Sequence, residues 1–424
     1  MEQEVEIEET SLSRRVSIVK ARADRIEEAA RQAVSLAGGL EKAIRSDTKV
    51  LIKPNLCRPA PSGSGHVTDC RVTEAITRMV LELEPRSVVI GEGAAAGYDF
   101  AGAHSTEEAF RVSGTEEVAR RLGVTIRNLN RDEVVEVKVE GPYCMDKVKI
   151  ARTALESDFI ISVPVMKTHV RTLVSLSLKN MKGVLPGEEK RKTHRLGLDM
   201  GIADLNSVVK PDFALVDALA ALEGWWKDPE DRVEMGILIA GSDPVAVDAV
   251  GAYLMDLDPK QIMHLQYVAR REVSTTDLDQ IEILGESIAA RRRSFKSAFE
   301  VFKERYPGIS IILGEFACTG CICEMIGALS HVKEAGFGEA MEGLKVVIGD
   351  APEREVASGK VLLFGKCAKQ IGRSGPHLQG CPPREEEALK AICQLSCVDT
   401  NEVISSRDRM RHQIWQATKT NLEA

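Results

Sequence analysis

Short apolar runs alternate with segments of helical periodicity over the first 270 residues. The extended runs cover residues 50–53, 87–91, 124–127, 158–163, 213–217 and 236–240, and the helical segments cover residues 23–37, 71–83, 106–122, 201–209, 244–255 and 260–271. Apolar runs of this length are typical of strands buried in a parallel sheet. The alternation predicts an α/β fold with a mostly parallel sheet and helices on both faces. Residues 133–150 are predicted to form an extended hairpin.

The alternation restarts in the C-terminal part of the chain. Strands are expected at residues 310–314, 345–349 and 360–365, and helices at residues 324–334 and 383–391. A charged amphipathic helix, residues 287–306, is expected to join the two parts and to end at Pro307-Gly308. These expectations divide the chain into a large α/β domain (1–280), a bridging helix (281–308), a small α/β domain that carries the cysteines (309–405) and a polar tail (406–424).

The composition excludes several classes of protein. The 424 residues are 44% hydrophobic and 28% charged, and the net charge of −8 argues against general nucleic-acid binding. No apolar run is long enough to span a membrane, and the acidic N-terminus lacks the apolar segment of a signal peptide. We expect a cytoplasmic protein with neither nucleic acid nor a membrane as a partner.

Seven of the ten cysteines follow residue 317, and four of them have the spacing of an iron–sulphur site. Cys318 and Cys321 form a C-x-x-C pair, and Cys367 and Cys381 follow, with Pro382 directly after the last. In a reducing compartment, clustered cysteines indicate metal or redox chemistry. Four thiolates and a proline after the last cysteine are typical of [4Fe–4S] ligands.

The predicted elements support convergence of these cysteines. Cys318 and Cys367 each follow a predicted strand, and Cys381 precedes a predicted helix. Loops that leave the carboxyl ends of parallel strands meet at one edge of the sheet. Pro382 or Pro383 suits the first helical position, and the nearby helix N-terminus would offset the negative charge of a cluster.

Other interpretations of the cysteines stay open. Four thiolates also suit structural zinc, while buried cysteines are common as core filler, and a redox disulphide is a further alternative. Cys323 is an alternative ligand to Cys321. The remaining cysteines are expected to pack in cores or to be structural: Cys393 and Cys397 at a helix end, and the isolated Cys57, Cys70 and Cys144.

Polar residues follow the predicted strands of the large domain. Lys53 and Asn55 come directly after a strand and before the glycine-containing loop 59–69, a pattern that indicates an anion site. The loop lacks P-loop spacing, so nucleotide hydrolysis is not indicated. Glu92 follows the next strand and is expected at the same rim.

Basic residues follow the strand at 158–163 in unusual density. Lys167 and His169 come first, then Lys179 and Asn180, and then the basic stretch 188–195. These cations are expected to hold a carboxylate or phosphate, and His169 or His194 to transfer protons. The alternative for residues 188–195 is a solvated basic loop.

Two aspartates also occupy strand ends. Asp217 ends one predicted strand, and Asp243 follows another. Both are expected to orient the polar residues or to bind a divalent cation. Asp243 precedes Pro244 at a predicted helix start, so helix capping alone also explains it.

Taken together, these segments resemble the prokaryotic domain of unknown function 362. The resemblance spans residues 48–270 and implies an α/β domain often joined to iron–sulphur modules, with no defined reaction. The family's usual C-x-x-C-x-x-C-x-x-x-C-P tail is absent here, so a different module with one cluster is implied. The matching segments are Ile52-Lys53-Pro54-Asn55-Leu56, Val163-Pro164-Val165-Met166-Lys167-Thr168-His169, Ser177-Leu178-Lys179-Asn180-Met181-Lys182-Gly183, Asp217-Ala218, Glu223-Gly224 and Ser242-Asp243-Pro244-Val245-Ala246-Val247-Asp248-Ala249.

The leading hypothesis is a [4Fe–4S] redox or electron-transfer protein. It is expected to act on an anionic small molecule and together with a redox partner protein. If it is an enzyme, the expected class is an iron–sulphur oxidoreductase. The expected cluster ligands are Cys318, Cys321, Cys367 and Cys381; the expected catalytic residues are Lys167, His169 and Asp217; and the expected substrate-binding residues are Lys53, Asn55, Lys179, Asn180 and Asp243. The alternatives are a non-redox transferase or isomerase with structural zinc, and a cluster-carrying assembly or binding protein.

Overall fold

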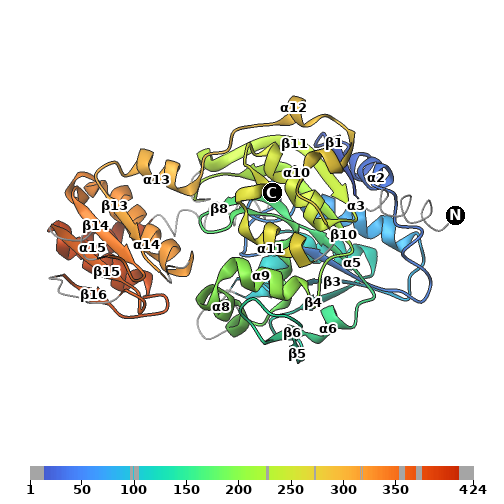
Figure 1. The fold of residues 1–424 in the computed structure, drawn as a ribbon. Helices are drawn as coiled ribbons and strands as arrows, with labels where there is room; N and C mark the ends of the chain where they lie inside the picture. Colours follow the sequence, from blue (N-terminus) through green and yellow to red (C-terminus); the bar gives the residue numbers. More distant parts are fainter. Residues whose placement is uncertain are drawn as a thin grey trace. The chain divides into compact units, whose positions relative to one another are not determined.

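Two compact units, residues 1–299 and 300–424, make up the chain in the computed structural model (Figure 1). The structure describes residues 14–95, 99, 105–225, 229–271, 274–315, 317, 319–352, 359–368 and 375–409. Both units are α/β, as the strand and helix pattern predicts. Among the described helices, none combines the length and apolar character needed to cross a bilayer. Most of the predicted polar tail lies outside the described residues.

The large unit is built on one mixed, mostly parallel sheet with strand order β12-β1-β11-β10-β7-β2-β3-β4. Along this path β11 runs antiparallel to its neighbours β1 and β10. Off the path, β8 pairs parallel with β10, and β9 pairs antiparallel with β8. The strands are β1 (Arg15–Lys20), β2 (Lys49–Pro54), β3 (Ser87–Glu92), β4 (Thr125–Asn128), β7 (Phe159–Val163), β8 (Val165–His169), β9 (Leu173–Ser175), β10 (Phe213–Leu222), β11 (Arg232–Gly241) and β12 (Glu282–Gly285).

Helices cover both faces of this sheet (Figure 1). In β10, Leu215 packs with α2 (Ile26–Leu36) and α3 (Cys70–Leu81), whereas Val216 packs on the opposite side with α10 (Pro244–Leu254). Successive strand side chains point to opposite faces, which explains the split. The six predicted strands and the helices on both faces are therefore confirmed.

Two predicted helices are divided in the structure. The segment 106–122 forms α4 (Thr106–Val112) and α5 (Thr115–Leu122), because Gly114 adopts a left-handed φ of 79° that interrupts the helix. The predicted continuous helix 287–306 is also wrong. It forms α12 (Ile288–Arg291) and α13 (Ala298–Arg305), with an extended stretch between them.

Tertiary contacts explain the second interruption. The backbone N–H groups of Arg293 and Phe295 donate to the carbonyl oxygens of Leu254 and Met255 at the end of α10. Phe295 is buried among the apolar residues on that face. Burial of this ring and pairing of the backbone outweigh the local helical preference.

The predicted hairpin is confirmed as antiparallel β5 (Val134–Lys138) and β6 (Lys147–Ala151).

The C-terminal unit contains a parallel sheet of order β13-β14-β15-β16. Its elements are β13 (Ser310–Leu313), α14 (Thr319–Val332), β14 (Leu344–Ile348), β15 (Lys360–Phe364), β16 (His377–Leu378) and α15 (Glu385–Ser396). The predicted small α/β unit is confirmed. The N-cap of α15 is Arg384, so the expectation that Pro382 or Pro383 opens this helix is wrong.

Candidate functional site

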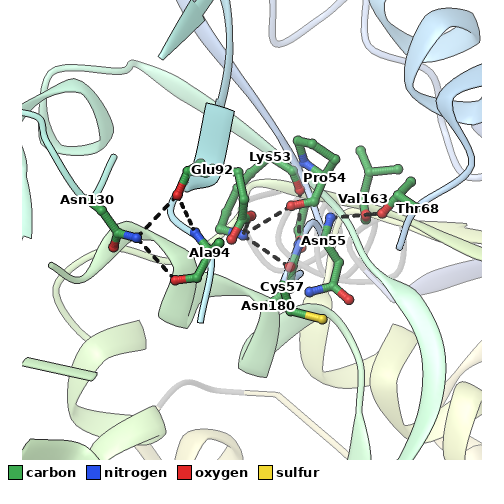
Figure 2. A network of polar contacts seen from close by, with 12 residues as sticks. Lys53, Pro54, Asn55, Cys57, Thr68, Glu92, Ala94, Asn130, Val163 and Asn180 are labelled. Atoms are coloured by element: carbon green, nitrogen blue, oxygen red, sulfur yellow. Dashed lines mark hydrogen bonds and ion pairs between the residues drawn. The ribbon is translucent and has the colours of Figure 1, made fainter. Parts of the chain in front are cut away.

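A buried ion pair joins the carboxyl ends of β2 and β3. Lys53 and Glu92 are 0% and 2% exposed, and Lys53 Nζ bonds to Glu92 Oε2. The same nitrogen donates to Asn180 Oδ1 at 3.0 Å and to the Pro54 carbonyl oxygen at 3.2 Å, while Asn180 Nδ2 donates to the Lys53 carbonyl oxygen at 2.9 Å (Figure 2). Sequence segments more than 120 residues apart therefore meet at this rim.

Burial acts on the two charges in opposite directions. It lowers the pKa of Lys53 and raises the pKa of Glu92, while the attraction between them opposes both changes. Lys53 and Asn180 hold each other and Glu92 in a closely bonded network. The substrate-binding role expected of these two side chains stays a prediction.

Gly183 lies against this ion pair. A methyl group on its Cα would lie 2.5 Å from Lys53 Nζ and closer still to Glu92 Oε1, within a fully buried network. We expect Gly183→Ala to lower the free energy of unfolding by about 1–3 kcal/mol through overpacking. Urea unfolding would measure the effect. Gly338→Ala is the control, because a methyl group there meets only Lys333 Cγ at 3.4 Å. Equal effects of the two substitutions would contradict the close packing.

The basic stretch 188–195 extends the network instead of forming a solvated loop. It lies within α8 (Gly187–Leu196), and Lys190 is 5% exposed. Lys190 Nζ donates to Asn130 Oδ1 at 2.5 Å. Burial lowers the pKa of Lys190 to about 7. The side chain of Lys190 is buried because α8 packs against the rest of the large unit. The number of charges along the sequence does not reveal this burial.

Cys57 and Lys167 meet beside this network. Lys167 Nζ lies 3.8 Å from Cys57 Sγ and donates to the His66 carbonyl oxygen at 2.6 Å. Lys167 is 2% exposed, and burial lowers its pKa. Asn55 Oδ1 is also buried and has no hydrogen-bond partner in the described part of the chain. A ligand near this loop would satisfy that oxygen.

A second group of cations gathers beyond the end of β8. We call it the histidine–lysine cluster: His169, Lys179, Lys182, His194 and His264. Lys182 Nζ lies 3.0 Å from His194 Nε2, and Lys179, His194, Lys182 and His264 all act electrostatically on His169. The structure thus separates the predicted site into two parts, since Lys53 and Asn180 form the buried network while His169 and Lys179 lie in this cluster.

The predicted aspartates stabilise the backbone. Asp217 Oδ2 and Oδ1 accept from the N–H groups of Asp69 and Leu219 at 2.7 and 3.0 Å. Asp243 caps α10 by accepting from Val245 and Ala246, and it also accepts from the Ser274 hydroxyl. Capping, the alternative raised for Asp243, is what the contacts show. The catalytic role expected of Asp217 and the binding role expected of Asp243 stay predictions.

Asp217 and the buried Asp248 predict an unusual pH dependence. Asp248 accepts from the N–H groups of Ser177 and Leu178, and burial raises the pKa of both carboxyl groups from 3.8 to about 7. The folded state therefore holds these protons more tightly than the unfolded state. The stabilisation is complete below pH 4 and is lost as the pH rises through 7.

We therefore expect Asp248→Asn to remove part of this pH dependence. Between pH 4.5 and 7.5, the free energy of unfolding of the variant should change by a few kcal/mol less than that of the wild type, about 4 kcal/mol being the upper bound for one group. Urea titrations at both pH values would measure the difference. Parallel pH profiles of the two proteins would show that Asp248 ionises normally.

The C-terminal cysteines approach one another through their neighbours. Cys321 lies in the first turn of α14 and is 6% exposed, and a methyl group on Gly365 would come within 2.7 Å of its Sγ. The N–H of Lys366 donates to the Gly380 carbonyl oxygen at 2.8 Å. The residues preceding Cys367 and Cys381 are thus joined to each other and lie beside Cys321.

The expected set of four cysteine ligands for an iron–sulphur cluster stays a prediction. Cys318 and the side chain of Cys323 lie outside the described part of the structure. Among described side chains, no three histidines, cysteines, aspartates or glutamates are arranged as a metal site. Cys393 is buried, as predicted for core packing, whereas Cys397 is exposed and ends α15 in the left-handed conformation, so core packing of Cys397 is wrong.

Several residues of the histidine–lysine cluster and the buried network were missed by the sequence reasoning. His264 and its partner Asp199, together with Asn130, were not singled out from the sequence. No local motif surrounds them. Only the packing of α9 (Leu198–Asn206) and α11 (Met263–Arg271) brings Asp199 and His264 together.

Comparison with known proteins gives one family match. Residues 50–253 match the family described as Domain of unknown function (DUF362). The chain is similar to the thylakoid-associated protein sll1697 of Synechocystis sp., with 25% identity over 236 residues that cover 53% of this chain and 68% of the relative.

Two solved structures show weaker likenesses. The lactate racemase apoprotein of Thermoanaerobacterium thermosaccharolyticum is 12% identical with a TM-score of 0.38, covering 80% of this chain and 70% of that one. A Thermotoga maritima protein is 14% identical with a TM-score of 0.36, covering 76% and 70%. Similarities at this level carry no functional inference.

Proposed function

We propose that this protein is a cytoplasmic iron–sulphur protein with a [4Fe–4S] cluster in its C-terminal unit. Cys318, Cys321, Cys367 and Cys381 would hold the cluster. In this proposal the protein has a redox or electron-transfer role and works with an anionic small molecule bound in the large unit and with a redox partner protein.

The surroundings of Cys321 support the cluster most directly. Gly365 has a left-handed φ of 96°, and its backbone approaches Cys321 so closely that a Cβ atom there would lie 2.7 Å from Sγ. Gly365 and Gly380 are close in sequence to Cys367 and Cys381, and the Lys366–Gly380 hydrogen bond fixes the two loops together. Thiolates carried by such loops suit the Cys₄ ligation of a [4Fe–4S] cluster.

A bound cluster would supply one-electron chemistry. The residues of the large unit would bind and orient the anion. His169 and Lys179 belong to the histidine–lysine cluster, in which Asp199 bonds to His264. The cationic lysines of this cluster favour an anionic ligand over a neutral or cationic one.

Metal and sulphide analysis of anaerobically purified full-length protein tests the proposal. We expect brown protein with broad absorption near ~400 nm and about four iron and four sulphide ions per chain. Colourless protein that carries stoichiometric zinc would contradict the redox role and favour the structural-zinc alternative. Protein without any metal after reconstitution with iron and sulphide would contradict both.

A further inference from the structure

The histidine–lysine cluster draws its side chains from five separate elements. His169 ends β8, Lys179 lies in α7 (Ser177–Asn180), Lys182 in the 3₁₀ turn η1 (Met181–Val184), His194 in α8 and His264 in α11. His169 and His264 are buried at 5% and 0% exposure, whereas the lysines and His194 are half-buried. The buried imidazoles therefore have a partly accessible rim of cations.

We propose that this cluster binds a dianionic oxyanion of the phosphate or phosphate-monoester class, and that binding is accompanied by proton uptake on its histidines. This inference rests on the proposed anionic small molecule and names its chemical class and its site. It does not depend on the iron–sulphur cluster.

His264 provides the observation that points most directly to a ligand. Its backbone N–H and its Nδ1 both lie 3.1 Å from Asp199 Oδ1. Its Nε2 is buried and has no hydrogen-bond partner among the described residues. A buried polar atom without a partner costs about 1–3 kcal/mol. A ligand that hydrogen-bonds to Nε2, while Nδ1 keeps its contact with Asp199, removes that cost.

His169 presents a donor to the same place. Its Nδ1 accepts from the backbone N–H groups of Arg171 and Thr172, both at 3.2 Å, and lies 3.0 Å from the Thr172 hydroxyl. With Nδ1 accepting, the neutral ring carries its proton on Nε2. The loop after β8 therefore sets the tautomer of His169 as a hydrogen-bond donor.

Electrostatics couples anion binding to protonation. Burial, followed by the charges of Lys179, His194, Lys182 and His264, holds the pKa of His169 well below its usual range. Burial, followed by Lys182, Lys179 and Arg171, does the same for the pKa of His194, whose Nδ1 is also buried without a partner in the described structure.

The two histidines are thus neutral at pH 7 when no anion is bound. A dianion would reverse the sign of the local field and raise both pKa values, so protons would be taken up with the ligand. Asp199 contacts the cluster through His264. A phosphate group suits this set of donors because its oxygens accept several charge-assisted hydrogen bonds at once.

Sulphate is the sharpest probe, because it stays dianionic across the neutral range. Calorimetry on the full-length protein would measure the binding of sulphate and of inorganic phosphate. As the pH is lowered from 8 to 6, sulphate should bind more tightly with each pH unit. The increase in affinity per unit is at most about 10-fold for uptake of one proton and about 100-fold for uptake of two. Heats in two buffers of different ionisation enthalpy count the protons directly. Absence of binding, or an affinity that does not change with pH, would overturn the proposal.

Variants test the location. Lys182→Met should weaken sulphate binding at least tenfold, and His194→Gln should reduce proton uptake. Lys138→Met removes the same charge from an exposed position on β5 and should leave binding unchanged. Equal effects of Lys182→Met and Lys138→Met would show that net charge alone attracts the ion and would overturn the site.

Two further outcomes separate ligand class from cluster function. Tighter binding of malonate than of phosphate or sulphate would overturn the phosphate class. Iron and sulphide contents measured on the same samples report the C-terminal unit independently. If sulphate binds as expected and iron is absent, the proposed redox role is wrong and the anion site is supported. If iron is present and sulphate does not bind, the anion site is wrong and the iron–sulphur proposal is supported.

Discussion

Cys321→Ser is expected to abolish the ~400 nm absorption of anaerobically purified protein and to remove most of its iron and sulphide. A serine hydroxyl is a poor replacement for a thiolate ligand, and Cys321 lies inside the C-terminal unit, where the closely packed residues beside it offer little room for adjustment. Cys367→Ser and Cys381→Ser should have the same effect. Iron, zinc and sulphide assays measure it.

Cys397→Ser provides the matched control. Cys397 belongs to the same unit, but it is exposed and only terminates α15. Its replacement should leave the absorption and the metal content unchanged. If Cys321→Ser retains the full iron content while Cys323→Ser loses it, the ligand assignment is wrong although the cluster stands. If neither change affects the metal, the four-cysteine site is wrong.

Lys53→Met is expected to produce the largest loss of stability. The substitution keeps the length of the side chain but leaves Glu92 buried without its cation. Removing one partner of a buried pair costs about 3–5 kcal/mol, because the remaining charge is uncompensated or must take up a proton. Urea unfolding of the wild type and the variant at pH 7 measures the difference.

The double variant Lys53→Met/Glu92→Leu separates the value of the pair from the cost of an orphaned charge. Replacing both charges by apolar groups should recover most of the stability that the single variant loses. Asn180 loses a donor in both proteins, which limits the recovery. An additive loss in the double variant would show that Lys53 and Glu92 are not coupled, contrary to their contact.

Much of the fold followed from local pattern. Each of the six predicted strands of the large unit and the three of the small unit is present, because buried runs such as 158–163 have no other stable placement than the inside of a sheet. The capping of α10 by Asp243 could also be predicted from the sequence, because aspartate directly before proline is a local pattern typical of a helix N-terminus. The broken helix at 292–297 was not, because its cause lies at the end of α10.

The rim that carries Lys53 and Glu92 was predictable from strand order alone, and so was the density of cations after residue 163. Which of those residues bond to a buried acid and which gather in the histidine–lysine cluster was decided only by tertiary packing. Lys53 meets Glu92 and Asn180, while His169 meets Lys179 and His264, through segments up to 127 residues apart. Charge and spacing along the chain carry no information about such distant partners. Burial, which shifts the pKa values of Lys53, Glu92 and His169, exists only in the folded protein.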